Sequence, residues 1–117
     1  MPTLRDLVTA LRRRDGVDAA VVFGRDGLVI DGEAVGPADV ERLAAHLPGV
    51  IAAADGFGDA AARGSLATAV LEYESGLAVV AVLSADALLM VLLRADADVA
   101  PLIYDLRRSR VQLAALV

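Results

Sequence analysis

Three apolar segments separated by two short turns occupy residues 65–93 of this chain. The second and third segments, 77–83 and 87–93, are apolar at every position, which is typical of strands covered on both faces of a sheet. The turns between the segments are too short for a crossover connection, so they can join only antiparallel neighbours. The sequence therefore predicts a meander of strands over 65–73, 77–83 and 87–93, with the last two strands inside the sheet.

The N-terminal part of the chain adds a helix and a hairpin. Thr3, with Asp6 three residues later, has the pattern of a capping box ahead of a helical apolar periodicity that is expected to end at Arg14. Alternating apolar residues over 17–23, a Gly-Arg-Asp-Gly turn and the apolar residues of 28–31 follow. This pattern predicts two antiparallel strands, of which the second is short.

Two further helices flank the meander. Pro37 suits a first helical position, and an apolar stripe predicts a helix over 37–60. Pro48-Gly49 falls inside this helix, where a proline removes a hydrogen bond, so we expect a kink or two abutting helices. Asp98 is the expected N-cap of the last helix, because Pro101 then falls in its first turn.

These elements define the layers of the fold. The strand over 87–93 needs a neighbour on each side; 77–83 is one, and 17–23, the longer strand of the first hairpin, is the better candidate for the other. Numbered in chain order, the strands then lie in the order 2-1-5-4-3. The helix over 37–60 crosses one face of the sheet, and the first and last helices share the opposite face. The prediction is an α/β (α+β) protein with a single domain over 1–117: a five-stranded antiparallel sheet in a three-layer α/β/α sandwich.

The third strand, which is expected at one edge of this sheet, carries neither proline nor a charge until Glu72. Soluble proteins normally protect an exposed edge strand with such residues, so an unprotected edge favours pairing with another chain. The commonest solution is a two-fold homodimer in which this strand meets its own copy. The alternative is that the helix over 37–60 or the loop over 56–64 covers the edge within the chain.

Composition argues against several classes of function. The chain of 117 residues has a net charge of −5 and only 3% aromatic residues, which argues against nucleic acid as a partner. It has no cysteine, which excludes disulfides and thiolate zinc sites. Its apolar runs are too short to span a membrane and no signal peptide is visible, so we expect a cytoplasmic protein without membrane insertion. Abundant alanine, with arginine in place of lysine, indicates a GC-rich bacterial source.

The sequence contains no recognisable catalytic constellation, and we expect neither an enzyme nor a bound cofactor or metal. The glycines of 55–59 are flanked by two aspartates, which would repel a phosphate group. His46, the only histidine, has no nucleophile or acid at a recognisable spacing, which favours a surface or interface position. Asp96 and Asp98 lack the glycine and the distal glutamate of a calcium loop, and a helix cap explains them better.

Arginines gather in the first and last helices, at 12–14 and at 107, 108 and 110. If these helices pack side by side, the six side chains form a basic stripe on an acidic protein. Such a stripe either complements the helix dipoles and faces solvent, or docks an acidic partner.

Four groups of residues follow one another in a specific order and spacing: Gly16-Val17-x-Ala19-Ala20-Val21-Val22-x-x-Arg25-Asp26-Gly27-Leu28-Val29-Ile30, Gly64-Ser65-Leu66 before a strand that ends at Glu72, Ala87-Leu88-Leu89, and Asp96-Ala97-Asp98. Together they resemble the Roadblock/dynein light-chain domain, in particular its bacterial MglB-type members. The resemblance covers essentially the whole chain.

This resemblance implies a non-catalytic homodimer whose sheet continues across two copies and serves as a platform for a Ras-like small GTPase. MglB-type members stimulate hydrolysis by their partner GTPase. The resemblance places the contacts with the second copy and with the partner on the third strand and on the helix over 37–60, where this chain departs from many relatives at Pro48-Gly49. The expected dimer contacts are Leu66, Thr68, Val70, Leu71, Glu72, Tyr73, Leu47 and Ile51. The residues expected to approach a partner are Arg42, His46 and Arg63.

Two other functions stay open at this point. The first is a structural subunit of a larger complex, assembled through sheet-edge pairing without GTPase regulation. The second is a sensor that binds a small ligand between sheet and helix, because the same layers occur in ligand-binding folds.

Overall fold

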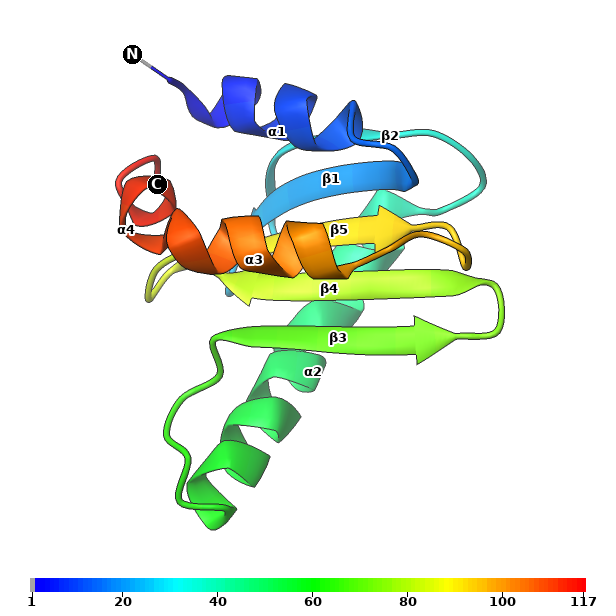
Figure 1. Cartoon of the computed structure of the whole chain (residues 1–117). Helices are drawn as coiled ribbons and strands as arrows, with labels where there is room; N and C mark the ends of the chain where they lie inside the picture. The colour runs from blue at the N-terminus through cyan, green and yellow to red at the C-terminus, as the bar shows by residue number, and fades with distance from the viewer. Residues whose placement is uncertain (1) are drawn as a thin grey trace.

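The computed structural model describes residues 2–117, so of the domain expected over 1–117 only Met1 lies outside the described chain. Its helices and strands are shown in Figure 1. In chain order they are α1 (Leu4–Arg12), β1 (Val17–Gly24), β2 (Val29–Ala34), α2 (Val40–Ala60), β3 (Thr68–Tyr73), β4 (Gly76–Val82), β5 (Ala87–Leu93), α3 (Ala100–Arg108) and α4 (Arg110–Ala114).

All the strands form one antiparallel sheet in the order β2-β1-β5-β4-β3, which confirms the predicted order. β5 lies in the middle between β1 and β4, and every residue of β5 except Leu92 is buried. The uninterrupted apolar pattern of β4 and β5 therefore reflects coverage on both faces of the sheet. The two edges of the sheet are β2 and β3.

The helices cover the two faces of this sheet unequally. α1, α3 and α4 lie on one face, and α2 alone crosses the other (Figure 1). Val8 of α1 packs with Leu102 and Leu106 of α3 in the apolar cluster of the first face. Leu47 and Ile51 of α2 pack in a separate cluster on the second face. The three-layer arrangement predicted from the sequence is thus confirmed.

α1 begins with the predicted capping box. The Thr3 hydroxyl accepts a hydrogen bond from the Asp6 N–H at 3.2 Å, and the Asp6 carboxylate accepts one from the Thr3 N–H at 2.9 Å. The helix ends at Arg12, two residues before the predicted end, and Arg13 is its C-cap. The chain then enters β1 through Gly16, whose positive φ of 84° suits glycine.

α2 begins later than predicted and is not divided at its proline. Asp39 is the N-cap and accepts a hydrogen bond from the Arg42 N–H at 3.2 Å, so the helix starts at Val40 and Pro37 lies outside it. An acidic cap therefore decides where the helix begins, because its carboxylate accepts from a helix N–H, whereas Gly36, the residue before Pro37, has no side chain that could do so. The helix then continues through Pro48 as one element, so the expectation of two abutting helices is wrong.

Pro48 lies where α2 meets the β1–β2 turn. Proline has no N–H for the carbonyl of Ala44, one helical turn earlier. Gly27, with a φ of 90°, lies directly against this carbonyl: a Cβ at this position would be 3.1 Å from the Ala44 oxygen. The turn can therefore approach α2 closely, because Gly27 has no side chain, and it does so at the Ala44 carbonyl, which receives no hydrogen bond from Pro48.

The last helix is capped differently from the prediction. Val99, and not Asp98, is the N-cap of α3, although the Asp98 side chain accepts a hydrogen bond from the Ala100 N–H at 3.1 Å. Pro101 lies in the first turn, as predicted. A break at Ser109 separates α3 from the short helix α4.

Strand boundaries differ from the prediction mainly at the two sheet edges. β2 extends beyond the predicted 28–31 to Ala34, which pairs with Ala19 of β1. β3 begins only at Thr68, because the preceding Leu66 directs its N–H to the Asp55 carboxylate, at 2.8 Å. The other strands agree with their predicted ranges within one residue.

Candidate functional site: the β3 edge and the adjacent groove

β3 presents unpaired backbone groups along its outer side. The N–H of Val82 on the β4 side donates to the carbonyl of Ala67, at 2.9 Å. Hydrogen-bonded and non-hydrogen-bonded pairs alternate along an antiparallel ladder, so Thr68, Val70 and Glu72 turn their N–H and C=O groups away from β4. Within residues 2–117, nothing donates to or accepts from these outward groups. The edge is therefore ready to pair with another strand.

The side chains of β3 alternate between the two faces of the sheet. Thr68, Val70 and Glu72 lie on the face of α1 and α3, because the β4 residues opposite them belong to the apolar cluster of that face. Leu71 and Tyr73 lie on the α2 face. Val70 is 45% exposed and Tyr73 63% exposed, so the edge carries uncovered apolar surface on both faces. Neither α2 nor the loop that follows it runs along the outside of β3 (Figure 1).

A groove of about 770 Å³ lies between α2 and the part of the sheet that this helix leaves uncovered. Its walls are mostly apolar, and it reaches the β3 edge through Leu71 and Tyr73. The groove is therefore open at the place where a second chain would join the sheet. Its lining includes Leu43, His46, Leu47 and Val50 from α2, and Leu71, Tyr73, Val80, Met90 and Leu92 from the sheet.

The C-terminal half of α2 projects beyond β3 and has no sheet beneath it (Figure 1). Phe57 lies in this projecting half and is 77% exposed. The Asp55 carboxylate holds the half in place, since it accepts from the Leu66 N–H at 2.8 Å and forms an ion pair with Arg25 at 3.6 Å. The chain thus displays an aromatic side chain on an anchored helix, away from its own core.

The structure divides the predicted dimer contacts into two groups. Six of them lie on β3 or just before it: Leu66, Thr68, Val70, Leu71, Glu72 and Tyr73. Leu47 and Ile51 are only 6% and 2% exposed, because the apolar stripe of α2 packs on the chain's own sheet. Both side chains belong to the core of the chain, and of the two only Leu47 also lines the groove through which a second copy could reach it.

The three residues expected to approach a partner are exposed but do not form one site. Arg42 and His46 lie in the first two turns of α2, and His46 borders the groove. Arg63 follows the opposite end of this helix, about 30 Å away. A single reacting atom of a partner cannot contact both arginines.

The arginines of the first and last helices do not merge into one stripe. α1 and α3 run in opposite directions across the sheet, so their C-terminal ends lie at opposite sides of the molecule (Figure 1). Arg12 donates to the Val17 carbonyl at 3.0 Å, and Arg14 to Asp105 at 2.8 Å. The hydrogen bond from Arg14 holds the pKa of Asp105 below its ordinary value. Only the arginines at the α3–α4 junction remain as a cluster.

The described residues show neither a cluster of metal-ligating side chains nor a buried titratable group. No three His, Asp or Glu side chains of residues 2–117 come together so as to hold a metal ion. In the same part of the chain, no helix is both long enough and apolar enough to cross a membrane. None of the polar or charged residues described is buried, so no titratable group is withdrawn from water as a general acid or base often is.

Sequence reasoning found the β3 edge but missed the groove and the projecting half of α2. Both result from the path of α2, which lies against the β1–β2 turn at Gly27 and leaves another part of the sheet uncovered. One signal was present in the sequence. Phe57 is one of only two phenylalanines and stands between two glycines, where a core residue is not expected.

Comparison with known proteins agrees with this geometry. Among solved structures, the chain is similar to a Roadblock/LC7 domain from Streptomyces avermitilis, with 26% identity over 97% of this chain and 93% of that chain, and a TM-score of 0.79. It shares its fold with the gliding protein MglB of Thermus thermophilus (19% identity, 96% and 86% covered, TM-score 0.84). The same holds for MglB of Myxococcus xanthus (13% identity, 92% and 88% covered, TM-score 0.80).

A comparison with curated proteins gives no significant match. The sequence model of the Roadblock/LC7 domain, however, matches residues 3–93, from the cap of α1 to the end of β5. This segment is well over half of the 117 residues and contains the whole sheet. The chain therefore belongs to the Roadblock/LC7 domain family.

Proposed function

We propose that this chain is a non-catalytic, homodimeric adaptor of the bacterial cytoplasm that binds and regulates a Ras-like small GTPase. The observation that carries the proposal is the free edge of β3, with its outward backbone groups and the exposed side chain of Val70. Membership of the Roadblock/LC7 family and the fold shared with MglB support it. The whole chain acts as one domain in this proposal.

The dimer forms when β3 pairs antiparallel with β3 of a second copy around a two-fold axis at Val70. In this register Val70 faces its own copy, and Thr68 faces Glu72 of the second copy. All three residues direct N–H and C=O groups outward, so each facing pair can exchange two hydrogen bonds. The two sheets then join into one continuous sheet.

The same axis brings the projecting half of α2 onto the second copy. This half lies on the α2 face and extends past β3, in the direction in which the second sheet continues (Figure 1). The groove of the second copy opens on this face beside its own β3 edge. Phe57 would enter this groove, and burial of its ring would contribute about 1.5–3 kcal/mol per copy.

The GTPase binds, in this proposal, to the surface formed by the paired α2 helices. Arg42 and His46 lie on the exposed part of α2, and Arg63 at its far end, so the two copies together surround a surface that neither forms alone. Regulation then comes from ordering of the switch loops of the GTPase. No arginine is assigned as a finger that reaches the bound nucleotide.

The test combines mass and turnover measurements. We expect sedimentation analysis to give a dimer at micromolar concentration, and we expect the chain to bind the Ras-like GTPase encoded nearest to its gene and to raise that enzyme's rate of GTP hydrolysis. A monomer contradicts the proposed assembly. A dimer that binds the GTPase in no nucleotide state contradicts the proposed regulation and indicates a structural subunit.

A further inference from the structure

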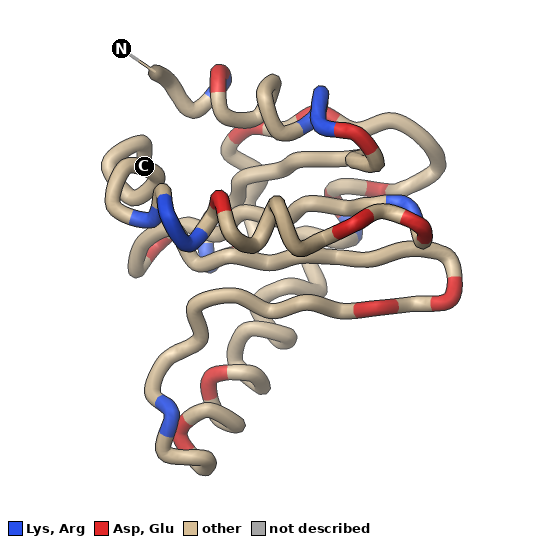
Figure 2. Tube along the Cα trace, viewed as in Figure 1, with Lys and Arg blue, Asp and Glu red and all other residues tan. Residues whose placement is uncertain are grey.

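The two ends of the β3 edge carry opposite charge. Arginines of the α3–α4 junction gather at the side of the molecule where β3 begins, and the acidic residues Glu72 and Glu74 lie where β3 ends and turns into β4 (Figure 2). The molecule as a whole is acidic, with a net charge of −5, so the basic group is a local feature. The edge therefore has a basic end, where β3 begins, and an acidic end, where β3 turns into β4.

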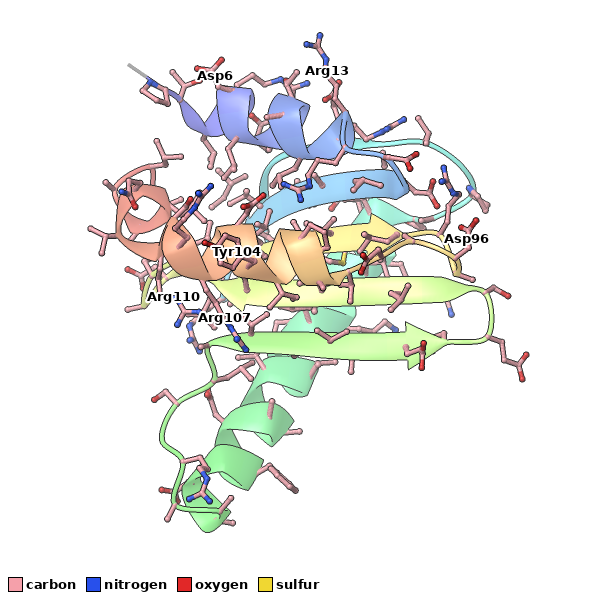
Figure 3. The ribbon with its side chains drawn as sticks, viewed as in Figure 1. Asp6, Arg13, Asp96, Tyr104, Arg107 and Arg110 are labelled. Atoms are coloured by element: carbon pink, nitrogen blue, oxygen red, sulfur yellow. The ribbon has the colours of Figure 1, made fainter. Side chains whose placement is uncertain are left out.

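The packing of α3 explains why its arginines lie at the beginning of β3. The helix starts next to Gly16, since the methyl group of Ala97 lies against that glycine, and runs toward the opposite end of the sheet. There Leu106 belongs to the same apolar cluster as Ala81, the β4 residue that pairs with Thr68. In Figure 3 the side chains of Arg107 and Arg110 point from the end of α3 toward the start of β3.

Two arginines of the basic group and both glutamates have no partner among residues 2–117. Asp105 binds Arg14 at 2.8 Å and Arg108 at 3.4 Å, and Arg108 also lies 5.4 Å from the centre of the Tyr104 ring. Arg107 and Arg110 make no ion pair or hydrogen bond with any residue of 2–117. The same is true of Glu72 and Glu74 in the part of the chain that the structure describes.

We propose that Arg107 and Arg110 bind Glu72 and Glu74 of a second copy and thereby fix the antiparallel orientation of the dimer. This inference rests on the proposed β3 pairing. In the register centred on Val70, Glu72 of the second copy stands opposite Thr68. Its side chain is then on the face of α3, the face from which the arginines approach. The two-fold axis repeats the contact at the other end of the edge.

The charges match only in the antiparallel arrangement. Parallel pairing of two β3 strands requires the second copy to turn over, so its arginines lie at the same end of the edge as those of the first copy but on the opposite face, and no arginine meets a glutamate. Antiparallel pairing brings opposite charges together at both ends on one face. Each exposed ion pair is weak, so such charges contribute mainly to specificity. The unpaired charges thus select one of the two ways in which a bare strand edge can pair.

The experiment is an exchange of charge between the two ends. One variant carries Arg107→Glu with Arg110→Glu, and the other carries Glu72→Arg with Glu74→Arg. Each variant alone faces like charges in its own homodimer, so we expect its Kd to rise about tenfold or more. In a mixture, both contacts of the heterodimer have opposite charge again. Native mass spectrometry of one labelled and one unlabelled variant should show mostly heterodimer, and more so at low than at high salt.

The controls separate this contact from folding and from dimer formation. Circular dichroism of both variants should match that of the unmodified chain, because all four residues are exposed. Arg13→Glu changes the exposed arginine that caps the end of α1, which lies far from β3 in Figure 3, and it should leave the Kd unchanged. A statistical mixture of homodimers and heterodimers overturns the charge contact while the dimer stands. An unmodified chain that stays monomeric overturns the dimer itself.

Discussion

The two edges of the sheet differ in what occupies their outward backbone groups. On β2, Gly32 faces outward; its N–H donates to the Asp31 carboxylate at 2.8 Å, and its carbonyl accepts from Arg5 of α1 at 3.4 Å. Arg5 also forms ion pairs with Asp31 at 2.7 Å and with Glu33 at 3.3 Å. On β3, the outward groups of Thr68, Val70 and Glu72 have no partner in the described chain.

This difference determines what kind of assembly the sheet can form. A protein with two free edges can add copies without limit and risks growing into a fibre. Here charged side chains occupy the β2 edge, and a bulge between Val22 and Phe23 disturbs its register. One covered edge and one free edge allow pairing once only, which is the property of a closed dimer.

The largest effect is expected where the free edge is damaged at the proposed axis. Val70→Pro removes an N–H that points away from β4, so the β3–β4 ladder should persist while both hydrogen bonds at the axis are lost. With the proline rings also obstructing the second strand, we expect the dimer Kd to rise about 1,000-fold, measured by sedimentation equilibrium.

The matched change on the other edge is Ala34→Pro, whose N–H also points away from its neighbouring strand. It should leave the dimer Kd unchanged. If the two prolines weaken the dimer equally, the edges are equivalent and the contrast between them is wrong.

A second substitution tests whether α2 contributes to dimer affinity in addition to the β3 edge. Phe57→Ala removes the exposed ring of the projecting half of α2 and leaves β3 untouched. The ring should be buried only in the dimer, and both copies lose it. Burial in an open groove is partial, so we expect the Kd to rise about a hundredfold, the lower end of the range for two rings, while the secondary structure of the chain stays the same. Isothermal dilution calorimetry measures this change.

Tyr104→Ala is the control for loss of an exposed aromatic residue, because Tyr104 lies on α3 and faces solvent. It should not change the Kd. If the Phe57 and Tyr104 variants had equal dimer affinities, the projecting half of α2 would contribute nothing to the interface, and β3 would be the sole contact.

A third substitution exposes the β2 edge and tests whether this edge can then also pair with another copy. Arg5→Ala with Asp31→Ala frees both outward groups of Gly32, and it removes one charge from β2 and the α1 charge that pairs with it. We expect species larger than a dimer to form at high concentration, as a weak and concentration-dependent increase in mass seen by light scattering. The Arg13→Ala variant, which removes the arginine that caps the end of α1, should remain dimeric. A double variant that stays dimeric at every concentration would mean that something else blocks this edge.

The sequence was sufficient for those parts of the fold that depend on local pattern. The continuous apolar residues of β4 and β5 placed both strands inside the sheet, and the Thr3–Asp6 box marked the start of α1. The absence of charge before Glu72 in β3 also indicated which edge is free. Each of these inferences needs only neighbouring residues and one physical rule.

The rest depended on contacts between distant segments. The continuation of α2 through Pro48 coincides with its packing against Gly27, twenty-one positions earlier. The β2 edge is covered by Arg5, which reaches Asp31 from another element, and no spacing in the sequence indicates that contact. For the same reason, the apolar stripe of α2 could not show that Leu47 faces the chain's own sheet and not a second copy.

The smallest effect is expected on the stability of the contact between α3 and α1, the helix whose Arg5 covers the β2 edge. Arg14, the last arginine of the α1 region, binds Asp105 of α3 at 2.8 Å and lowers the pKa of this carboxyl. A lowered pKa in the folded state means that the contact contributes stability above the ordinary carboxyl pKa and loses it as the pH falls below about 4. Asp105→Asn should therefore lower the Tm slightly at pH 7, and the difference from the unmodified chain should vanish in acid. Because the two side chains are 32% and 39% exposed, solvent and ions reach the pair and the difference should also shrink in high salt. A difference in Tm that is constant with pH and salt would assign the effect to packing of α3 and not to its charge.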